Sequence, residues 1–239
     1  MLTEVEGRQP VLELFRSGEP INKLLVAKGE RQGSIIKILQ LAKEHHIVVQ
    51  EVPRESLDQM SQTQAHQGVI ALVSPVSYQD FDKLLQTNTK HFYLVLDGLE
   101  DPHNLGSLVR TAEACGVTGV IIPKRRAVPV TATVAKTSAG AIAHIPICRV
   151  NNIVAVLERL KEVGCWIAGA DLAGQVCYKQ DLKGPLALVI GSEGKGLSRL
   201  VKEHCDFLVH IPMYGQIGSL NASVAGGILL YEITKQQNG

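Results

Sequence analysis

Apolar residues recur along this chain in short runs separated by amphipathic stretches, with glycine and proline at many of the joins. From residue 92 onward the runs are nearly continuous, as in 92–96 and 186–190, which is typical of strands buried on both faces of a parallel sheet. Stretches such as 153–163 space their apolar residues like one face of a helix. This pattern predicts a largely parallel α/β sheet covered by helices on both faces. The expected strands are 92–96, 117–122, 145–150, 165–170, 186–190 and 207–211, and the expected helices are 105–115, 131–138, 153–163, 197–204 and 220–235.

A smaller α/β unit precedes this sheet. Its predicted helices are 11–16, 34–45 and 53–60, and its predicted strands are 21–27, 47–52 and 69–73. A polar stretch with one weak amphipathic turn around Phe81, Leu84 and Leu85 follows and is interpreted as a linker. The predicted organisation is therefore a first domain at 1–75, a linker at 76–91 and a second domain at 92–239.

Composition is that of an ordinary globular protein: 45% apolar and 20% charged residues in a chain of 239. The chain has 24 Lys and Arg and 23 Asp and Glu, a formal net charge of +1, so its overall electric field would not attract nucleic acid. Any contact with RNA therefore needs a local basic patch. Lys124, Arg125 and Arg126 form the best candidate, although a solvated charge run is the usual explanation of such a triplet.

Cysteine usage and hydropathy indicate a cytoplasmic location. The five cysteines form no C-x-x-C pair, and their odd number argues against a disulfide framework, so reduced thiols are expected. No run of about 18 apolar residues occurs, so no membrane span is expected. The eight histidines and five cysteines show no recognisable metal-ligand spacing, so no metal site is expected either.

The unusual polar residues follow predicted strands, where a parallel sheet places its ligands. GSEGKG (191–196) is rich in glycine but fails the spacing of the P-loop, the dinucleotide loop and the nucleophile elbow, which leaves a small-molecule pocket or a flexible helix-entry loop. Six positions separate Asn104 from Arg110, or 240° net around a helix, so the two side chains are not on the same stripe. They converge only if Asn104 lies in the loop before the helix and Arg110 points back toward it. Asn104 and Ser219 are also plausible helix caps.

Three stretches together go beyond a generic pattern: DPHNLGSLVRTAEACGV (101–117), LVIGSEGKGLS (188–198) and IPMYGQIGSLNASVA (211–225). In order and spacing they resemble the three motifs of the SpoU (TrmH-like) RNA 2′-O-ribose methyltransferases. The sequence of residues 119–141 is most similar to the branch of this family that methylates a guanosine of 23S ribosomal RNA. The catalytic resemblance covers about 92–236, and 7–75 resembles the small L30e-like substrate-binding domain of that family.

The resemblance implies a SPOUT-type parallel sheet with a deep C-terminal trefoil knot, where general rules alone predict an unknotted sheet. It implies methyl transfer from S-adenosylmethionine to a ribose 2′-hydroxyl, with S-adenosylhomocysteine as product and no metal. The implied partners are RNA, either 23S ribosomal RNA or transfer RNA, and a second copy of the chain in a homodimer.

Carried over by position, the motifs imply two groups of site residues. The matches to catalytic and RNA-positioning residues are Asn104, Arg110, Glu193, Ser219 and Asn221. Backbone around Gly191, Ile211 and Leu220 would hold the cofactor, with Thr137, Gly169 and Met213 as wall residues.

The chemistry leaves the proton acceptor open. A ribose hydroxyl is a poor nucleophile until its proton is removed or polarised. The resemblance assigns this activation to Arg110, whereas a guanidinium ordinarily stays protonated. Arg110 would either pass a proton to an RNA phosphate or clamp that phosphate while another group accepts the proton. Rival functions are a transfer-RNA ribose methyltransferase, a non-catalytic RNA-binding protein and a nucleotide-dependent oxidoreductase; the missing dinucleotide fingerprint disfavours the last.

Overall fold

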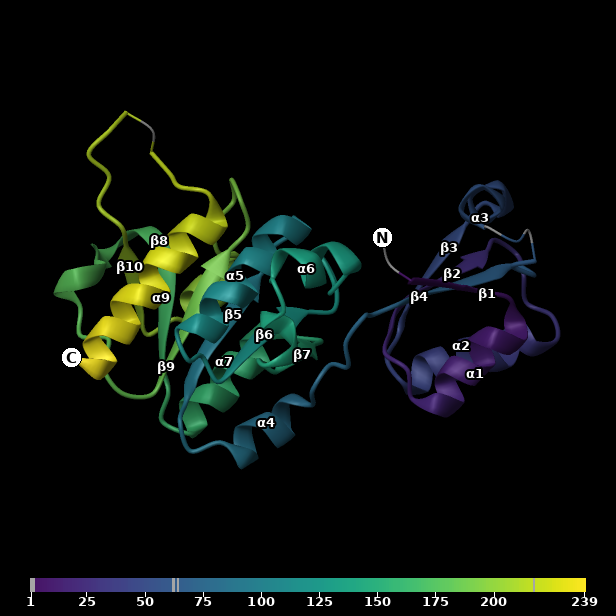
Figure 1. Cartoon of the computed structure of the whole chain (residues 1–239), viewed down its shortest axis with the longest axis horizontal. Helices are drawn as coiled ribbons and strands as arrows, with labels where there is room; N and C mark the ends of the chain where they lie inside the picture. The colour runs from purple at the N-terminus through teal and green to yellow at the C-terminus, as the bar shows by residue number, and fades with distance from the viewer. Residues whose placement is uncertain (1–2, 62, 64, 217) are drawn as a thin grey trace. The chain divides into compact units, whose positions relative to one another are not determined.

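The structure is a computed structural model and describes residues 3–61, 63, 65–216 and 218–239. It divides into two compact units, coloured along the chain in Figure 1. The first comprises Met1–Ser77 with Pro129–Ala132, and the second comprises Tyr78–Val128 with Thr133–Gly239. Parts of the predicted first domain (residues 1, 2, 62 and 64) and Ile217 of the third motif lie outside the described residues.

The first unit is built on a four-stranded sheet of order β1-β4-β2-β3. β4 pairs antiparallel with β1 and β2, and β2 pairs in parallel with β3. Because side chains alternate along a strand, Val69 and Ala71 of β4 pack with α1 and α2, while Ile70 and Leu72 pack with α3. The elements are β1 (Thr3–Glu6), α1 (Arg8–Ser17), β2 (Ile21–Ala27), α2 (Ser34–Glu44), β3 (Val48–Val52), α3 (Arg54–Met60) and β4 (Val69–Val73).

The second unit is built on a six-stranded sheet of order β10-β8-β9-β5-β6-β7, in which every pairing is parallel. This confirms the predicted parallel sheet. The elements are α4 (Phe81–Thr87), β5 (Phe92–Asp97), α5 (Pro102–Ala114), β6 (Gly119–Pro123), α6 (Ala132–Thr137), η1 (Ala141–Ala143), β7 (Ile147–Val150), α7 (Ile153–Glu162), β8 (Trp166–Val176), η2 (Cys177–Lys179), β9 (Leu186–Gly191), α8 (Arg199–Glu203), β10 (Phe207–His210) and α9 (Ala222–Asn238).

Helices cover both faces of this sheet. Leu157 of α7 packs with Tyr93 of β5 and Val189 of β9 in a core that also includes residues of α4 and α8. Ile190, the next residue of β9, points to the opposite face, where α5 and α9 lie side by side (Figure 1). A Cβ at Gly226 of α9 would lie only 2.4 Å from Leu108 Cδ2 of α5, so this glycine lets the two helices approach closely.

Three segments differ from the sequence prediction. Residues 3–6 form a strand that the sequence pattern did not predict, because the segment TEVE is short and mostly polar. Within the predicted linker, residues 81–87 form the helix α4, where only a weak amphipathic turn was expected: Asp80 caps the helix by accepting a hydrogen bond from Lys83 N at 2.9 Å, and Leu84 and Leu85 are buried. β8 continues six residues past its predicted end at 170, because it pairs with β10 again at Gln175 and Val176.

Candidate functional site

The start of α5 places the first predicted site residue. β5 ends at Asp97, and Asp101 caps the helix by accepting a hydrogen bond from His103 N at 2.9 Å, with Pro102 at the first position. Asn104 therefore lies inside the first turn of α5 rather than at its cap, and its side chain is only 5% exposed. A buried amide requires partners for both its N–H groups and its oxygen.

The glycine loop after β9 folds back tightly on the strand. Ser192 and Gly196 exchange backbone hydrogen bonds of 3.0 and 2.9 Å. A Cβ at Gly191 would lie 2.1 Å from the carbonyl carbon of Gly196, so only glycine fits here. The loop is thus a closed turn that presents Glu193, rather than the flexible helix entry that the sequence left open.

Asn221 caps α9, and this corrects the interpretation of Ser219 as the cap. Its Oδ1 accepts from Ser223 N (2.9 Å), Ser223 Oγ (2.6 Å) and Val224 N (3.3 Å). Three donors on one oxygen fix which way the amide points. The Nδ2 group of Asn221 is therefore directed away from the helix.

Asn104, Glu193 and Asn221 form a closed triangle of hydrogen bonds. Glu193 Oε1 accepts from Asn104 Nδ2 at 2.6 Å and from Asn221 Nδ2 at 2.8 Å. Asn221 Nδ2 also donates to Asn104 Oδ1 at 3.0 Å. One residue from each of the three sequence motifs meets at this point, and we call the group the amide–carboxylate triangle. It holds a carboxylate in a fixed orientation beside the mouth of α9.

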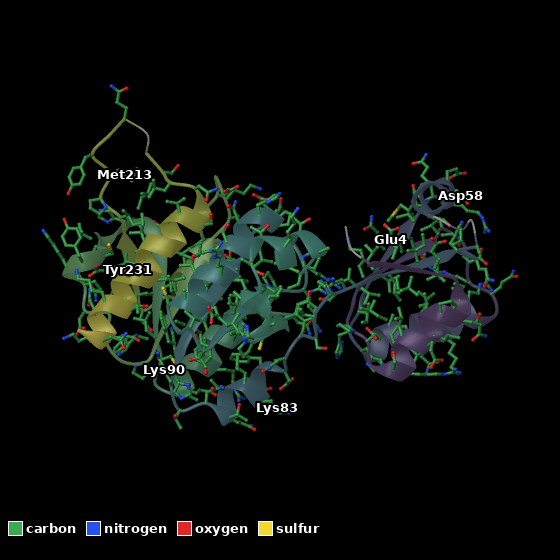
Figure 2. All side chains as sticks on the ribbon, viewed as in Figure 1. Glu4, Asp58, Lys83, Lys90, Met213 and Tyr231 are labelled. Atoms are coloured by element: carbon green, nitrogen blue, oxygen red, sulfur yellow. The ribbon has the colours of Figure 1, made fainter. Side chains whose placement is uncertain are left out.

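A pocket of about 120 Å³ lies between β8, β10 and α9. Four of the predicted site residues line it: Ile211, Met213, Ser219 and Leu220. Met213 lies on the loop that leads from β10 to α9 (Figure 2). The other lining residues are mainly apolar: Ala170, Asp171, Leu172, Val209, His210, Ala225 and Leu229. We call this the apolar pocket; its walls suit a flat, largely uncharged ring, with one carboxylate at the edge.

That carboxylate, Asp171, is kept ionised. Burial opposes its charge, but the Lys202 ammonium at 2.8 Å and the Ala173 N–H at 2.9 Å outweigh this effect. The pKa of Asp171 is therefore below its ordinary value. At neutral pH the edge of the apolar pocket carries a negative charge.

The structure does not bring every predicted residue to the triangle or to the apolar pocket. Gly191 and Gly169 lie in strands beside them and are fully enclosed; a Cβ at Gly169 would lie 2.7 Å from Cys205 Sγ. Thr137 lies on α6, with its Cβ 2.6 Å from where a Cβ at Gly106 would be, and is not among the lining residues. Arg110 is exposed on α5 and makes no hydrogen bond or ion pair with the described residues.

Sequence reasoning missed two residues of the site. Ser223 orients the Asn221 amide, and Asp171 charges the rim of the apolar pocket. The spacing N-x-S at the mouth of an apolar helix is a signal for the first, since a serine two residues after a cap can share its oxygen. No local signal marks the second, because Asp171 reaches the pocket only through the pairing of β8 with β10.

The described part of the chain contains no cluster of three metal-ligating side chains, and none of its helices is long and apolar enough to cross a membrane. The five cysteines are unpaired thiols.

The second unit belongs to the class of parallel α/β domains, in which ligands bind at the carboxyl ends of the strands. Comparison with known proteins narrows the class. Residues 91–231 match the SpoU rRNA methylase family model, and residues 5–79 match the model for RNA 2′-O ribose methyltransferase substrate binding. The chain is 49% identical, over 98% of its length and 96% of the relative, to YacO of Bacillus subtilis (strain 168), which is assigned to the TrmH family of tRNA/rRNA methyltransferases. The chain belongs to the SpoU methylase family, which confirms the resemblance seen in its motifs.

Solved structures agree with this assignment. The SpoU methyltransferase AviRb from Streptomyces viridochromogenes, in complex with S-adenosylmethionine, superposes with a TM-score of 0.62 at 26% identity, covering 98% of this chain and 89% of that one. A TrmH/SpoU tRNA modifying enzyme of A. aeolicus gives 0.56 at 29% identity over 65% and 82% of the two chains. The six-stranded parallel sheet is thus that of the SPOUT methyltransferases.

Proposed function

We propose that this protein transfers a methyl group from S-adenosylmethionine to a ribose 2′-hydroxyl in structured RNA, and that the target is a guanosine of 23S ribosomal RNA. The observation that carries the proposal is the contact of all three motifs in the amide–carboxylate triangle, next to an apolar pocket lined by Ser219 and Leu220. Family membership supports the reaction class. The similarity of residues 119–141 to the branch that methylates 23S ribosomal RNA supports the choice of target.

The apolar pocket fits the adenosine part of S-adenosylmethionine. Met213, Leu220 and Leu229 provide apolar walls for a flat ring, and the ionised Asp171 offers an acceptor for ribose hydroxyls or charge compensation for a sulfonium. When bound, the cofactor supplies an activated methyl group on a positively charged sulfur, so no metal is needed. AviRb was solved with this same cofactor.

The protein's own residues would then align the acceptor. Two amide N–H groups hold Glu193 in position, and its second oxygen can accept a hydrogen bond from a ribose hydroxyl. Ser219, at the rim of the apolar pocket, supplies a hydroxyl for the RNA backbone. Positioning of this kind can account for much of a rate enhancement.

Arg110 would act on a phosphate. Its guanidinium stays protonated in proteins and presents a fork of N–H donors that matches a phosphate. Because Arg110 is exposed and makes no hydrogen bond or ion pair with the described residues, those donors are available to RNA. We propose that it clamps a phosphate beside the target ribose and polarises the hydroxyl through it.

The first unit would be the L30e-like RNA-binding domain, since residues 5–79 match a substrate-binding model. The trefoil knot implied by the motifs would lie in the C-terminal segment. In its support, β10 pairs with β8 on both sides of the interruption at 170–174, and a Cβ at Gly174 would lie 2.2 Å from the Leu208 carbonyl carbon.

We also propose a homodimer that covers the outer face of α9. Val224, Ile228 and Tyr231 recur at helical spacing on that face and are 49%, 41% and 68% exposed (Figure 2 labels Tyr231). Tyr178 of η2 adds a further half-exposed aromatic ring beside them. An apolar stripe of this kind is typical of an interface between subunits.

The proposed activity is tested by titrating S-adenosylmethionine and NAD separately and by measuring transfer of labelled methyl groups to unmodified 23S ribosomal RNA and transfer RNA. Binding of S-adenosylmethionine with transfer to 23S RNA is expected. Transfer to transfer RNA alone would support the second candidate, which the likeness to the A. aeolicus tRNA modifying enzyme favours. Binding of NAD without methyl transfer would overturn both.

A further inference from the structure

A groove of about 810 Å³ lies at the carboxyl ends of β5, β6 and β9, and Glu193 is one of the residues that line it. Three segments form it: 97–101 from the last residue of β5, 123–126 from the last residue of β6, and 192–198 after β9. Arg125, Arg126 and Lys195 line it, and we call it the basic-loop groove.

Backbone hydrogen bonds hold these loops together. Val128 N donates to Leu99 O at 2.8 Å, and Ser198 N donates to Asp97 Oδ2 at 2.7 Å. Gly98, in the left-handed region at φ +81°, faces the Arg126 carbonyl oxygen, which would lie 3.5 Å from a Cβ. Arg126 itself has a φ of +57°, a strained value for a residue with a side chain. Strained backbone of this kind clusters at active sites and ligand-binding sites.

The three cations of the groove have no partner within the described chain: no hydrogen bond or ion pair joins Arg125, Arg126 or Lys195 to a described residue. Three of the four carboxylates that line the groove are already engaged. Asp97 accepts from Ser198, Asp101 caps α5, and Glu193 belongs to the triangle. Glu100 remains unengaged among the described residues.

We propose that the basic-loop groove holds a phosphate of the nucleotide whose 2′-hydroxyl is methylated, through Arg125, Arg126 and Lys195. This rests on the proposed function and names the phosphate site of that reaction. Because Glu193 belongs to both the groove and the triangle, a ribose that reaches the triangle can leave its phosphate in the groove.

Lys124, the first residue of the basic triplet, has a different environment. It does not line the groove, and burial together with the nearby Arg149 guanidinium lowers the pKa of Lys124. The triplet is thus not one solvated charge run: its second and third residues line the groove, and its first does not.

The proposal is tested with the full-length protein and an unmodified 23S ribosomal RNA transcript, by measuring the dissociation constant at several salt concentrations. The double variant R125Q/R126Q should weaken binding roughly tenfold or more. The slope of log K against log salt should become shallower by about 0.7–0.9 for each phosphate that the variant no longer neutralises. Lys195→Gln should give a smaller change of the same kind. Affinity for S-adenosylmethionine should stay unchanged in all variants, which also shows that they fold.

Lys183→Gln is the matched control, because Lys183 is exposed just before β9 begins, at the opposite end of that strand from the groove. A salt slope of R125Q/R126Q equal to that of Lys183→Gln would overturn the proposal. Glu100→Gln should have the opposite effect, because removal of this carboxylate's negative charge should tighten RNA binding. Weaker binding would show that the groove instead recognises N–H donors of an RNA base. If the wild-type protein methylates no RNA at all, the proposed function itself fails, which is a distinct outcome.

Discussion

Asn104 donates its side-chain N–H to Glu193 Oε1 at 2.6 Å, although 89 positions separate the two residues in the chain. The contact exists because β5 and β9 are neighbours in the sheet, so the loops that follow them open at the same edge. Asn221 completes the group from the mouth of α9.

Glu193→Gln tests whether the charge of this group matters. The variant keeps the shape of the side chain but replaces a carboxylate by an amide, whose hydrogen bonds to Asn104 and Asn221 are weaker. We expect kcat to fall by about 10–100-fold, as for the removal of one charge-assisted hydrogen bond. Affinity for S-adenosylmethionine should change little, as measured by calorimetry. An unchanged kcat would mean that Glu193 only closes the loop.

Arg110→Ala should abolish methyl transfer while leaving cofactor binding nearly intact, because Arg110 lines neither the triangle nor the apolar pocket. Arg110→Lys should recover only part of the activity, since an ammonium keeps the charge but not the planar fork. Single-turnover assays with labelled cofactor measure both. Full activity of the alanine variant would remove Arg110 from the mechanism.

Two adjacent glycines of α9 provide a matched pair. Gly226→Ala places a Cβ 2.4 Å from Leu108 Cδ2 and should destabilise the protein by about 1–3 kcal/mol through overpacking. Gly227→Ala meets only Thr111 Cγ2 at 3.8 Å and should stabilise the helix by about 0.5–1 kcal/mol. Urea unfolding at one fixed protein concentration compares the two. Equal destabilisation would show that helix packing is not the reason for the glycine at 226.

The Asp171–Lys202 pair should make stability depend on pH. Because the pKa of Asp171 is lowered in the folded protein, the stabilisation is fully present above the ordinary carboxyl pKa and is lost as the pH falls through the lowered value. Asp171→Asn should therefore destabilise the protein by about 0.5–1 kcal/mol at pH 7 and by less near pH 3. Lys202→Gln should show the same trend. A difference that grows toward low pH would contradict the pairing.

Tyr231→Asp should split the proposed dimer, because it places a charge in the exposed apolar stripe of α9. Light scattering of the wild-type protein should give twice the 25.9 kDa chain mass, and the variant should give the mass of one chain. Glu203→Asp, a conservative change on the surface of α8, serves as the control. A wild-type mass of one chain would count against the dimer.

Sequence patterns predicted the parallel sheet because its strands are continuous apolar runs, which hydrophobic periodicity reports directly. Strand β1 was not predicted, because the segment TEVE is stabilised as a strand by its pairing with β4. No local feature of the sequence indicates that pairing. The motifs predicted Asn104, Glu193 and Asn221 as site residues but not their mutual hydrogen bonds, which depend on strand order.

The same limit applies to caps and pocket walls. Asn221 and Ser219 are both good cap residues, and only the backbone decides between them. Asp171 lines the apolar pocket because of the interrupted pairing of β8 with β10. The two strands are too far apart in the chain for a local sequence pattern to predict this pairing.

The most direct test of the proposed reaction is to map the methyl group that the wild-type protein transfers from labelled S-adenosylmethionine to unmodified 23S ribosomal RNA. We expect a single labelled guanosine whose 3′ linkage resists alkali, because a methylated 2′-oxygen cannot attack the neighbouring phosphate. Label on a base, with every linkage cleaved by alkali, would contradict 2′-O-methylation.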